Sequence, residues 1–151
     1  NQNPIPIPSG TAINSFWKQI YLKVTGGTFT QIDNVKFYTD GGGFGTGITT
    51  FVGNQLPVKN SGANTGYVVA TGTTGTSGNA MVASHAGISA QTDAFSFTSG
   101  SPLSITISEA GGLMNATNET TNYLVTQMNV ASTAGPGNLA DETWTYQYDE
   151  I

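Results

Sequence analysis

Short segments in which every second residue is apolar recur along this sequence. Residues 20–24 are one example, and residues 144–148, with Trp144, Tyr146 and Tyr148 on one face, are another. Successive side chains of a β-strand point to opposite faces, whereas a helix repeats its apolar positions about every 3.6 residues. A helical repeat is absent from almost the whole chain. The pattern therefore predicts an all-β protein whose strands each bury one face.

Turn-forming residues separate these segments and divide the 151 residues into about eight or nine strands. The expected strands lie within residues 20–24, 35–38, 48–52, 67–69, 95–97, 103–107, 124–130 and 143–148. Short, closely spaced strands favour a single-domain antiparallel β-sandwich, jelly-roll or immunoglobulin-like, over parallel βαβ units. In residues 124–130 the even-numbered positions are expected to face the core. We expect the glycine-rich residues 41–47 to form a hairpin loop, and residues 80–90 to hold at most one helical turn.

Charged residues are scarce, which limits the partners that the chain can bind. They make up 9% of the sequence, against about 25% in an ordinary soluble domain. The net charge is −5 and arginine is absent, so we do not expect nucleic-acid binding, which depends on Lys and Arg. No apolar run approaches the roughly 20 residues of a membrane helix, and no membrane partner is expected. The lack of cysteine excludes disulfides.

Side chains that carry out catalysis are nearly missing. The one histidine, His85, follows Ser84, but adjacent strand residues point to opposite faces and no nucleophile-elbow motif surrounds them. One histidine and no cysteine leave too few ligands for a zinc site. The nine acidic residues are scattered, which argues against the paired carboxylates of a glycoside hydrolase. We therefore expect a protein that is not an enzyme, with no catalytic residues and no cofactor.

Calcium binding and glycosylation are two alternatives that the sequence leaves open. Oxygen ligands suited to a structural calcium ion lie in or near loops at residues 33–34, Asp40 and residues 141–142, but no EF-hand spacing links them. Their simpler role is to cap turns with side-chain hydrogen bonds. Asn115 and Asn118 each begin an Asn-X-Thr triplet, which an exported protein can carry as a glycosylation site.

The N-terminal segment differs from the rest of the chain because prolines alternate with isoleucines. Proline fixes φ near −65° and has no amide donor, so residues 1–12 are expected to form an extended arm and not a central strand. Residues 13–151 would then form the sandwich domain. Either the arm docks on a neighbouring subunit or it packs on its own domain. The candidate subunit-interface residues are Pro4, Ile5, Pro6, Ile7 and Pro8.

Three aromatic residues share one face of the last expected strand: Trp144, Tyr146 and Tyr148. The first interpretation is that they fill the core, since large aromatic side chains dominate buried surfaces. A patch buried against a neighbouring subunit comes next, and a platform for binding sugars comes last.

Two segments have strand patterns that also occur in a known class of proteins. One runs from Trp17 to Asp40 and includes IYLKVTGGT and IDNVKFYTD, and the other is WTYQYDE, residues 144–150. They cover a minor part of the chain and resemble head-associated structural proteins of tailed phages, of the capsid decoration or cement type. The resemblance implies a β-sandwich that decorates or cements a capsid lattice, with no catalytic residues to carry over.

The leading functional hypothesis is a structural protein on the exterior of a virion, which stabilises the shell by bridging subunits. Its partners would be the major capsid protein or copies of itself, as a homo-oligomer. The first alternative is an extracellular filament or surface-layer subunit that assembles by strand or arm exchange. The third is a carbohydrate-binding module. The first residue is Asn rather than Met, which fits a processed protein or leading residues that are not included.

Overall fold

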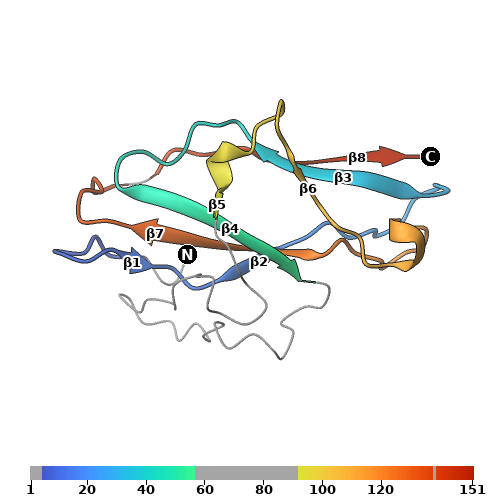
Figure 1. Cartoon of the computed structure of the whole chain (residues 1–151), viewed down its shortest axis with the longest axis horizontal. Coiled ribbons are helices and arrows are strands. Elements are labelled where there is room, and N and C mark those ends of the chain that lie inside the picture. Colours follow the sequence, from blue (N-terminus) through green and yellow to red (C-terminus); the bar gives the residue numbers. More distant parts are fainter. Residues whose placement is uncertain (1–4, 57–91, 138) are drawn as a thin grey trace.

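Two antiparallel β-sheets pack face to face in the computed structural model, which describes residues 5–56, 92–137 and 139–151 (Figure 1). The five-stranded sheet contains β1 (Ile13–Asn14), β2 (Lys18–Ile20), β7 (Tyr123–Val130), β4 (Ile48–Leu56) and β5 (Thr92–Asp93). The three-stranded sheet contains β6 (Leu103–Ser104), β3 (Ile32–Thr39) and β8 (Trp144–Glu150). Two short 3₁₀ helices are η1 (Ala94–Ser96) and η2 (Ala110–Gly112). The expected all-β sandwich is confirmed.

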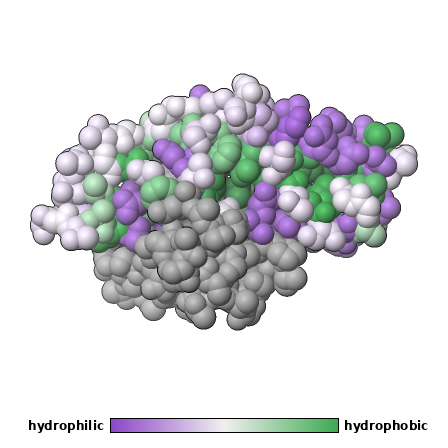
Figure 2. Space-filling model, viewed as in Figure 1, coloured by the Kyte–Doolittle hydropathy of each residue, from purple (hydrophilic) through white to green (hydrophobic). Residues whose placement is uncertain are grey.

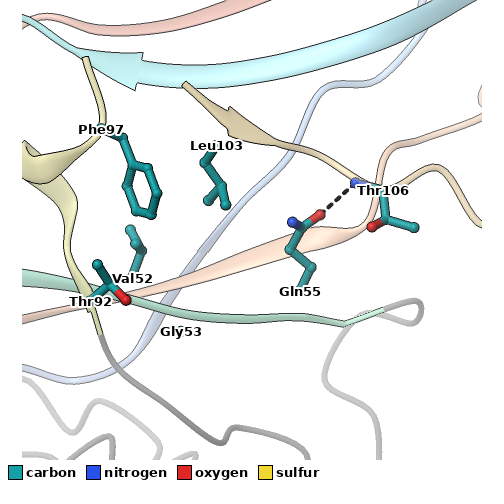
Figure 3. A pocket seen from close by; sticks show the side chains of 7 residues that line it. All are labelled: Val52, Gly53, Gln55, Thr92, Phe97, Leu103 and Thr106. Atoms are coloured by element: carbon teal, nitrogen blue, oxygen red, sulfur yellow. Dashed lines mark hydrogen bonds between the residues drawn. The ribbon is translucent and has the colours of Figure 1, made fainter. Parts of the chain in front are cut away.

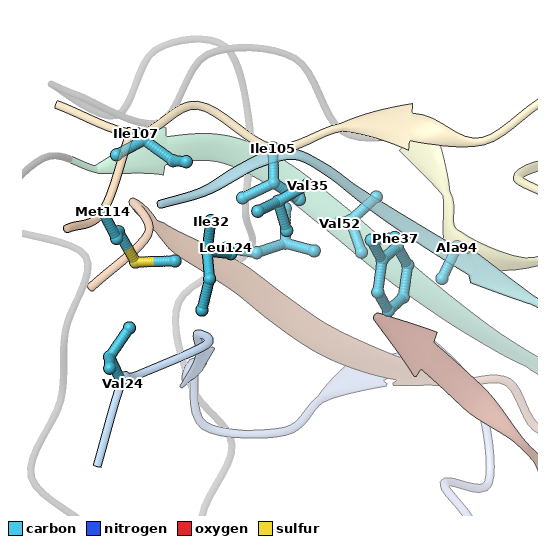
Figure 4. Packing of buried hydrophobic residues seen from close by; sticks show 10 residues of the cluster. All are labelled: Val24, Ile32, Val35, Phe37, Val52, Ala94, Ile105, Ile107, Met114 and Leu124. Atoms are coloured by element: carbon cyan, nitrogen blue, oxygen red, sulfur yellow. The ribbon is translucent and has the colours of Figure 1, made fainter. Parts of the chain in front are cut away.

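The core lies between the inner faces of the two sheets (Figure 4). Val35 and Phe37 of β3 point into it, and Phe37 is fully buried. Val52 of β4 and Leu124 of β7 face them from the other sheet. The alternation within residues 35–38 therefore predicted the inner face of β3 correctly, and residues 48–52 form part of a strand as expected.

The strand β7 is buried on both faces, which the sequence pattern did not indicate. Leu124 faces the core as expected, but Val125 is also fully buried and packs with Trp17, Phe51 and Tyr123 on the outer face of the five-stranded sheet. The sequence predicted that the even-numbered residues of β7 share one face, and it did not indicate that the other face is covered as well. The reason is that aromatic side chains from separate parts of the chain cover the outer face.

A bulge separates β1 from β2, which lie one after the other along the same edge of β7. The Ser15 hydroxyl accepts from the Met128 amide at 2.9 Å. The buried Gln127 side chain donates to the Ser15 carbonyl at 2.8 Å. These bonds satisfy polar groups that the interrupted ladder would otherwise leave unpaired.

One side of the sandwich is closed by hydrogen bonds that join the two sheets. Gln55, on β4, donates from Nε2 to the Ser104 carbonyl at 2.7 Å, and its Oε1 accepts from the Thr106 amide at 2.6 Å. The Ile105 amide, next in the chain, donates to the Val35 carbonyl of β3 at 2.8 Å. Residues 103–106 therefore bond to both sheets.

Two more connections extend this closure. The Asn122 amide donates to the Thr106 carbonyl at 2.8 Å, and the Ser108 hydroxyl donates to Asn122 Oδ1 at 2.7 Å. At the other end, the Thr39 amide and hydroxyl both donate to the Phe97 carbonyl, at 2.9 and 3.0 Å. We call residues 97–108 and these partners the closed flank.

Several local expectations are corrected. Residues 41–47 are not a hairpin loop, because β3 and β4 belong to different sheets and the segment crosses between them. Residues 95–97 are not a strand: Asp93 caps η1 by accepting from the Phe95 amide at 3.1 Å. The strand expected over residues 103–107 is assigned only over β6, although Ile105 and Ile107 are buried.

Two expected elements, the strand over residues 67–69 and the helical turn over residues 80–90, lie outside the described residues.

The crossing segment 41–47 also packs closely against another loop. At Gly47, with φ of +76°, a Cβ atom would come within 2.5 Å of the Ala134 nitrogen, so only glycine fits there.

Candidate functional site

Of the residues that suggested chemistry, the described part of the chain brings Asp40 and Glu142 side by side. Ser84 and His85 lie outside the described residues. Within the described residues, no group of three or more His, Cys, Asp or Glu side chains is arranged to hold a metal ion. Residues 33–34, which were also considered for calcium, lie at the opposite end of β3 from Asp40.

Asp40 and Glu142 lie beside each other where the segment 41–47 leaves β3. The Gly42 amide donates to Asp40 Oδ1 at 3.0 Å, and this bond holds the pKa of Asp40 below its usual value. Desolvation raises the pKa of Glu142, and the neighbouring Asp40 carboxylate raises it further. The pair is an exposed turn cap with mutual repulsion, and two carboxylates are fewer oxygens than calcium takes.

Asp33 and Asn34 lie at a bulge in β3, where the pairing with β8 shifts register. The Gln31 amide group donates to Asp33 Oδ2 at 2.6 Å, and Asn34 Nδ2 donates to Asp149 Oδ2 at 2.8 Å. Asn34 has φ of +48°, a conformation that asparagine tolerates better than most residues. These side chains therefore hold the bulge. Figure 2 shows hydrophilic residues gathered over this end of the three-stranded sheet.

The two Asn-X-Thr triplets form one tight, exposed loop. Glu119 Oε2 accepts from the amides of Asn115 and Ala116, at 2.6 and 2.8 Å. Asn118 has φ of +77°, and its amide donates to the Val24 carbonyl at 2.8 Å. Asn115 and Asn118 are both exposed. Exposure is compatible with modification, and the loop bonds give the asparagines a structural role without it.

The aromatic face of β8 is divided between core and surface. Trp144 and Tyr146 pack edge-on against Phe37, with ring centroids 5.5 and 5.7 Å apart. Tyr148 is 42% exposed. The first two therefore fill the core, as the leading interpretation held, and they leave no exposed row of rings for a sugar.

Two polar atoms on this inner face have no hydrogen-bond partner among residues 5–56, 92–137 and 139–151. They are Trp144 Nε1 and the Tyr146 hydroxyl, and both are buried. Burial also raises the pKa of Tyr146 far above its usual value. Unpaired buried polar groups are uncommon in native structures, and each weakens the packing around it.

In the part of the chain that the structure describes, the outer side of β8 is a sheet edge with no partner strand. Among the strands that the structure describes, β8 pairs only with β3. The Thr39 and Ile32 amides, opposite Trp144 and Glu150, donate away from β8 to Phe97 and Met114. Backbone groups of successive residues in an antiparallel strand point to alternate sides. The even-numbered residues of β8 therefore direct their N–H and C=O groups away from β3.

The odd-numbered positions agree with this assignment. Ile151, directly after β8, donates its amide to the Gln31 carbonyl at 3.0 Å, and its carbonyl accepts from the Gln31 amide at 3.1 Å. By the same alternation, the amides of Thr145, Gln147 and Asp149 face β3. The backbone N–H and C=O groups on the side of β8 away from β3 belong to Trp144, Tyr146, Tyr148 and Glu150.

The N-terminal arm forms no strand in the described range 5–12. Ile5 and Pro8 are half-buried, and Ile7 is 40% exposed. Pro4 lies outside the described residues. Residues 9–11 form a bend, and the role of the preceding residues as a subunit interface stays a prediction.

A pocket of about 360 Å³ opens beside the closed flank (Figure 3). Its described lining is Val52, Gly53, Gln55, Thr92, Phe97, Leu103 and Thr106. Phe97 and Leu103 point into the space, and the hydrogen bond from Thr106 to Gln55 crosses one end of it. This lining offers apolar contact and neutral hydrogen bonds, with no acid or base.

No protein-family model, curated protein or solved structure matches this chain. No helix among the described residues is long and apolar enough to span a membrane. The candidate functional site is therefore defined by geometry alone, and the feature with the clearest binding chemistry is the free edge of β8. Sequence reasoning found β8 as a terminal strand but could not find the edge, because strand order is set by contacts far apart in the chain.

Proposed function

We propose that this chain is a non-enzymatic structural protein that decorates and cements the shell of a virus particle from its exterior. The observation that carries the proposal is the edge of β8, seven residues long, which pairs with no further strand among the described residues. An edge of that length presents a row of unpaired backbone donors and acceptors. Natural proteins usually cover such an edge, so a free one is suited to pairing with another chain.

The mechanism that follows is adhesive. A protein that binds the assembled shell and not its dissociated subunits stabilises the shell by mass action. Backbone pairing along a sheet edge supplies affinity, and side chains beside the edge supply specificity. The partners would be the major capsid protein or further copies of this chain, and no cofactor takes part.

A second candidate is a subunit of an extracellular filament or surface layer. The same edge favours it, because strand exchange between identical subunits needs one free edge and one extended segment in each copy. The residues 5–8, which precede a bend at residues 9–11, would supply such a segment. The sugar-binding alternative has less support, because Trp144 and Tyr146 are in the core.

Electron microscopy of the native source, with gold-labelled antibody against this chain, tests the proposal. Label on the outside of closed particles is the expected result. Label along fibres or a sheet-like cell envelope would favour the second candidate. Label on neither kind of assembly would contradict both.

A binding assay then tests the adhesive mechanism. The purified chain should sediment with particles from which it has been stripped, and raise the temperature at which they release nucleic acid. A Tyr148→Pro variant, which removes one outward amide of β8, should sediment less. Equal sedimentation of the variant and the parent would contradict a role for the edge.

A further inference from the structure

We propose that the N-terminal arm of one copy pairs, as an antiparallel strand, with the free edge of β8 in a second copy. The inference rests on the proposed function, because it names one of the contacts by which the protein would assemble. It is carried by a match between the spacing of the prolines and the direction of the free backbone groups of β8.

The prolines of the arm all fall on one side of an extended chain. Pro4, Pro6 and Pro8 occupy even positions, and Ile5 and Ile7 occupy odd ones. Because backbone groups alternate from side to side along a strand, the isoleucine amides all point to the side opposite the prolines. The arm therefore keeps a complete row of donors and acceptors on one side. Prolines weaken a strand that must pair on both sides, but not one that pairs on this side alone.

The pairing also places the isoleucine side chains on the apolar face. On β8 the outward-pointing backbone groups include those of Tyr146 and Tyr148, whose side chains lie on the inner face of the sheet. Residues that exchange hydrogen bonds across an antiparallel pair carry their side chains on the same face. Ile5 and Ile7 would therefore lie beside the two tyrosines, and Tyr148 would lose its exposure.

A parallel arrangement would give the opposite result. In a parallel pair, a residue that bonds to its neighbour lies opposite one whose backbone groups point away. The isoleucines would then share the outer face with Thr145, Gln147 and Asp149. That face is polar and exposed at its end, so burial of apolar side chains selects the antiparallel orientation.

The length of the N-terminal arm and its restricted backbone conformation also suit pairing with β8. Residues 5–8, before the bend at residues 9–11, fit within the seven positions of β8, and the arm has no charged side chain to meet Asp149 and Glu150. Each residue before a proline is restricted to extended conformations. Less conformational entropy is therefore lost when the arm is ordered on an edge.

The arm would also be the last strand of the sheet that it joins. Its outer side presents proline rings and carbonyls without amide donors, which blocks addition of a further strand. Each copy still carries both an arm and an edge, so the contact is head-to-tail. Such contacts close into rings or continue as open arrays, according to the rotation between copies.

Cross-linking between two differently tagged copies tests the inference, because the parent chain has no cysteine. One copy carries Ile5→Cys or Ile7→Cys, the other carries Tyr148→Cys, and a short bismaleimide joins them. The matched control is Pro6→Cys, whose side chain would face the other side of the sheet. We expect cross-linking on the order of tenfold stronger from an isoleucine position than from Pro6, because adjacent strand positions face opposite sides.

Three results would overturn the inference. They are equal yields from the isoleucine and proline positions, no cross-link at the highest soluble concentration, and a cross-link within one doubly substituted copy that is insensitive to dilution. The particle sedimentation assay separates this inference from the proposed function. Particle binding without the arm-to-β8 cross-link would leave the cement proposal standing and remove the arm pairing. The cross-link without particle binding would do the reverse.

Discussion

The two flanks of the sandwich differ in how their backbone groups are used. On the closed flank, residues 97–108 bond to both sheets, and the Gln55 side chain acts as a bridge between them. On the open flank, β8 bonds to β3 on one side and directs alternate backbone groups outward. On the closed flank, hydrogen bonds join the two sheets to each other. On the open flank, a row of backbone groups of β8 stays available to a partner. The difference predicts that substitutions on the two flanks will separate stability from assembly.

Gln147→Pro should have the largest effect on stability. The Gln147 amide faces β3, so proline removes a ladder bond and leaves a carbonyl of Lys36 without its donor. We expect the free energy of unfolding to fall by about 2–3 kcal/mol. Urea unfolding followed by tryptophan fluorescence measures it. If Gln147→Pro lowers the free energy of unfolding by less than Tyr148→Pro does, the assigned direction of the β8 amides is contradicted.

Gln55→Ala should come next, because it opens the closed flank. Two bonds to backbone groups are lost, and the Ser104 carbonyl and Thr106 amide must find water. The expected loss is about 1–2 kcal/mol, measured by thermal or urea unfolding. Gln55→Met, which keeps most of the side-chain volume, should lose nearly as much. A stability close to the parent for Gln55→Met would show that packing, and not bridging, is the role of this residue.

Tyr146→Phe should increase stability by about 0.5–1 kcal/mol, because it removes a buried hydroxyl that has no hydrogen-bond partner. The matched control is Tyr148→Phe, whose exposed hydroxyl should be neutral to replace. Differential scanning calorimetry of the two variants makes the comparison. A loss of stability for Tyr146→Phe would mean that the hydroxyl has a partner in solution.

Tyr148→Pro should have the smallest effect on stability and a clear effect on assembly. Tyr148 is 42% exposed and its amide does not face β3, so the unfolding free energy should stay within about 0.5 kcal/mol of the parent. Sedimentation velocity should show a smaller associated fraction. An unchanged associated fraction would place the assembly contact elsewhere on the molecule.

The sequence predicted which faces of the strands are buried better than it predicted how the strands are connected. Alternation located the inner face of β3 and the terminal strand β8, because burial of one face has a local period. It failed at Phe95, where a cap on Asp93 favours a 3₁₀ turn. It also failed at residues 41–47, because glycine permits a turn without fixing which sheet receives the next strand.

The candidate site was harder to predict for the same reason. The arm could be recognised from its prolines, but the edge that suits it depends on which strand lies last in the sheet. Gln55 gave no signal at all, since its two partners are about fifty residues away in the chain. Long-range pairing of this kind becomes visible only when the sheets are assembled.

Residue-resolved amide hydrogen exchange along β8 tests the central claim most directly. In the dilute, unassembled chain, the amides of Thr145, Gln147 and Asp149 should be protected, whereas those of Tyr146, Tyr148 and Glu150 should exchange rapidly. In the assembled state the second set should become protected as well. Uniform protection along β8 in the unassembled chain, or no added protection on assembly, would contradict a free edge that serves as the binding surface.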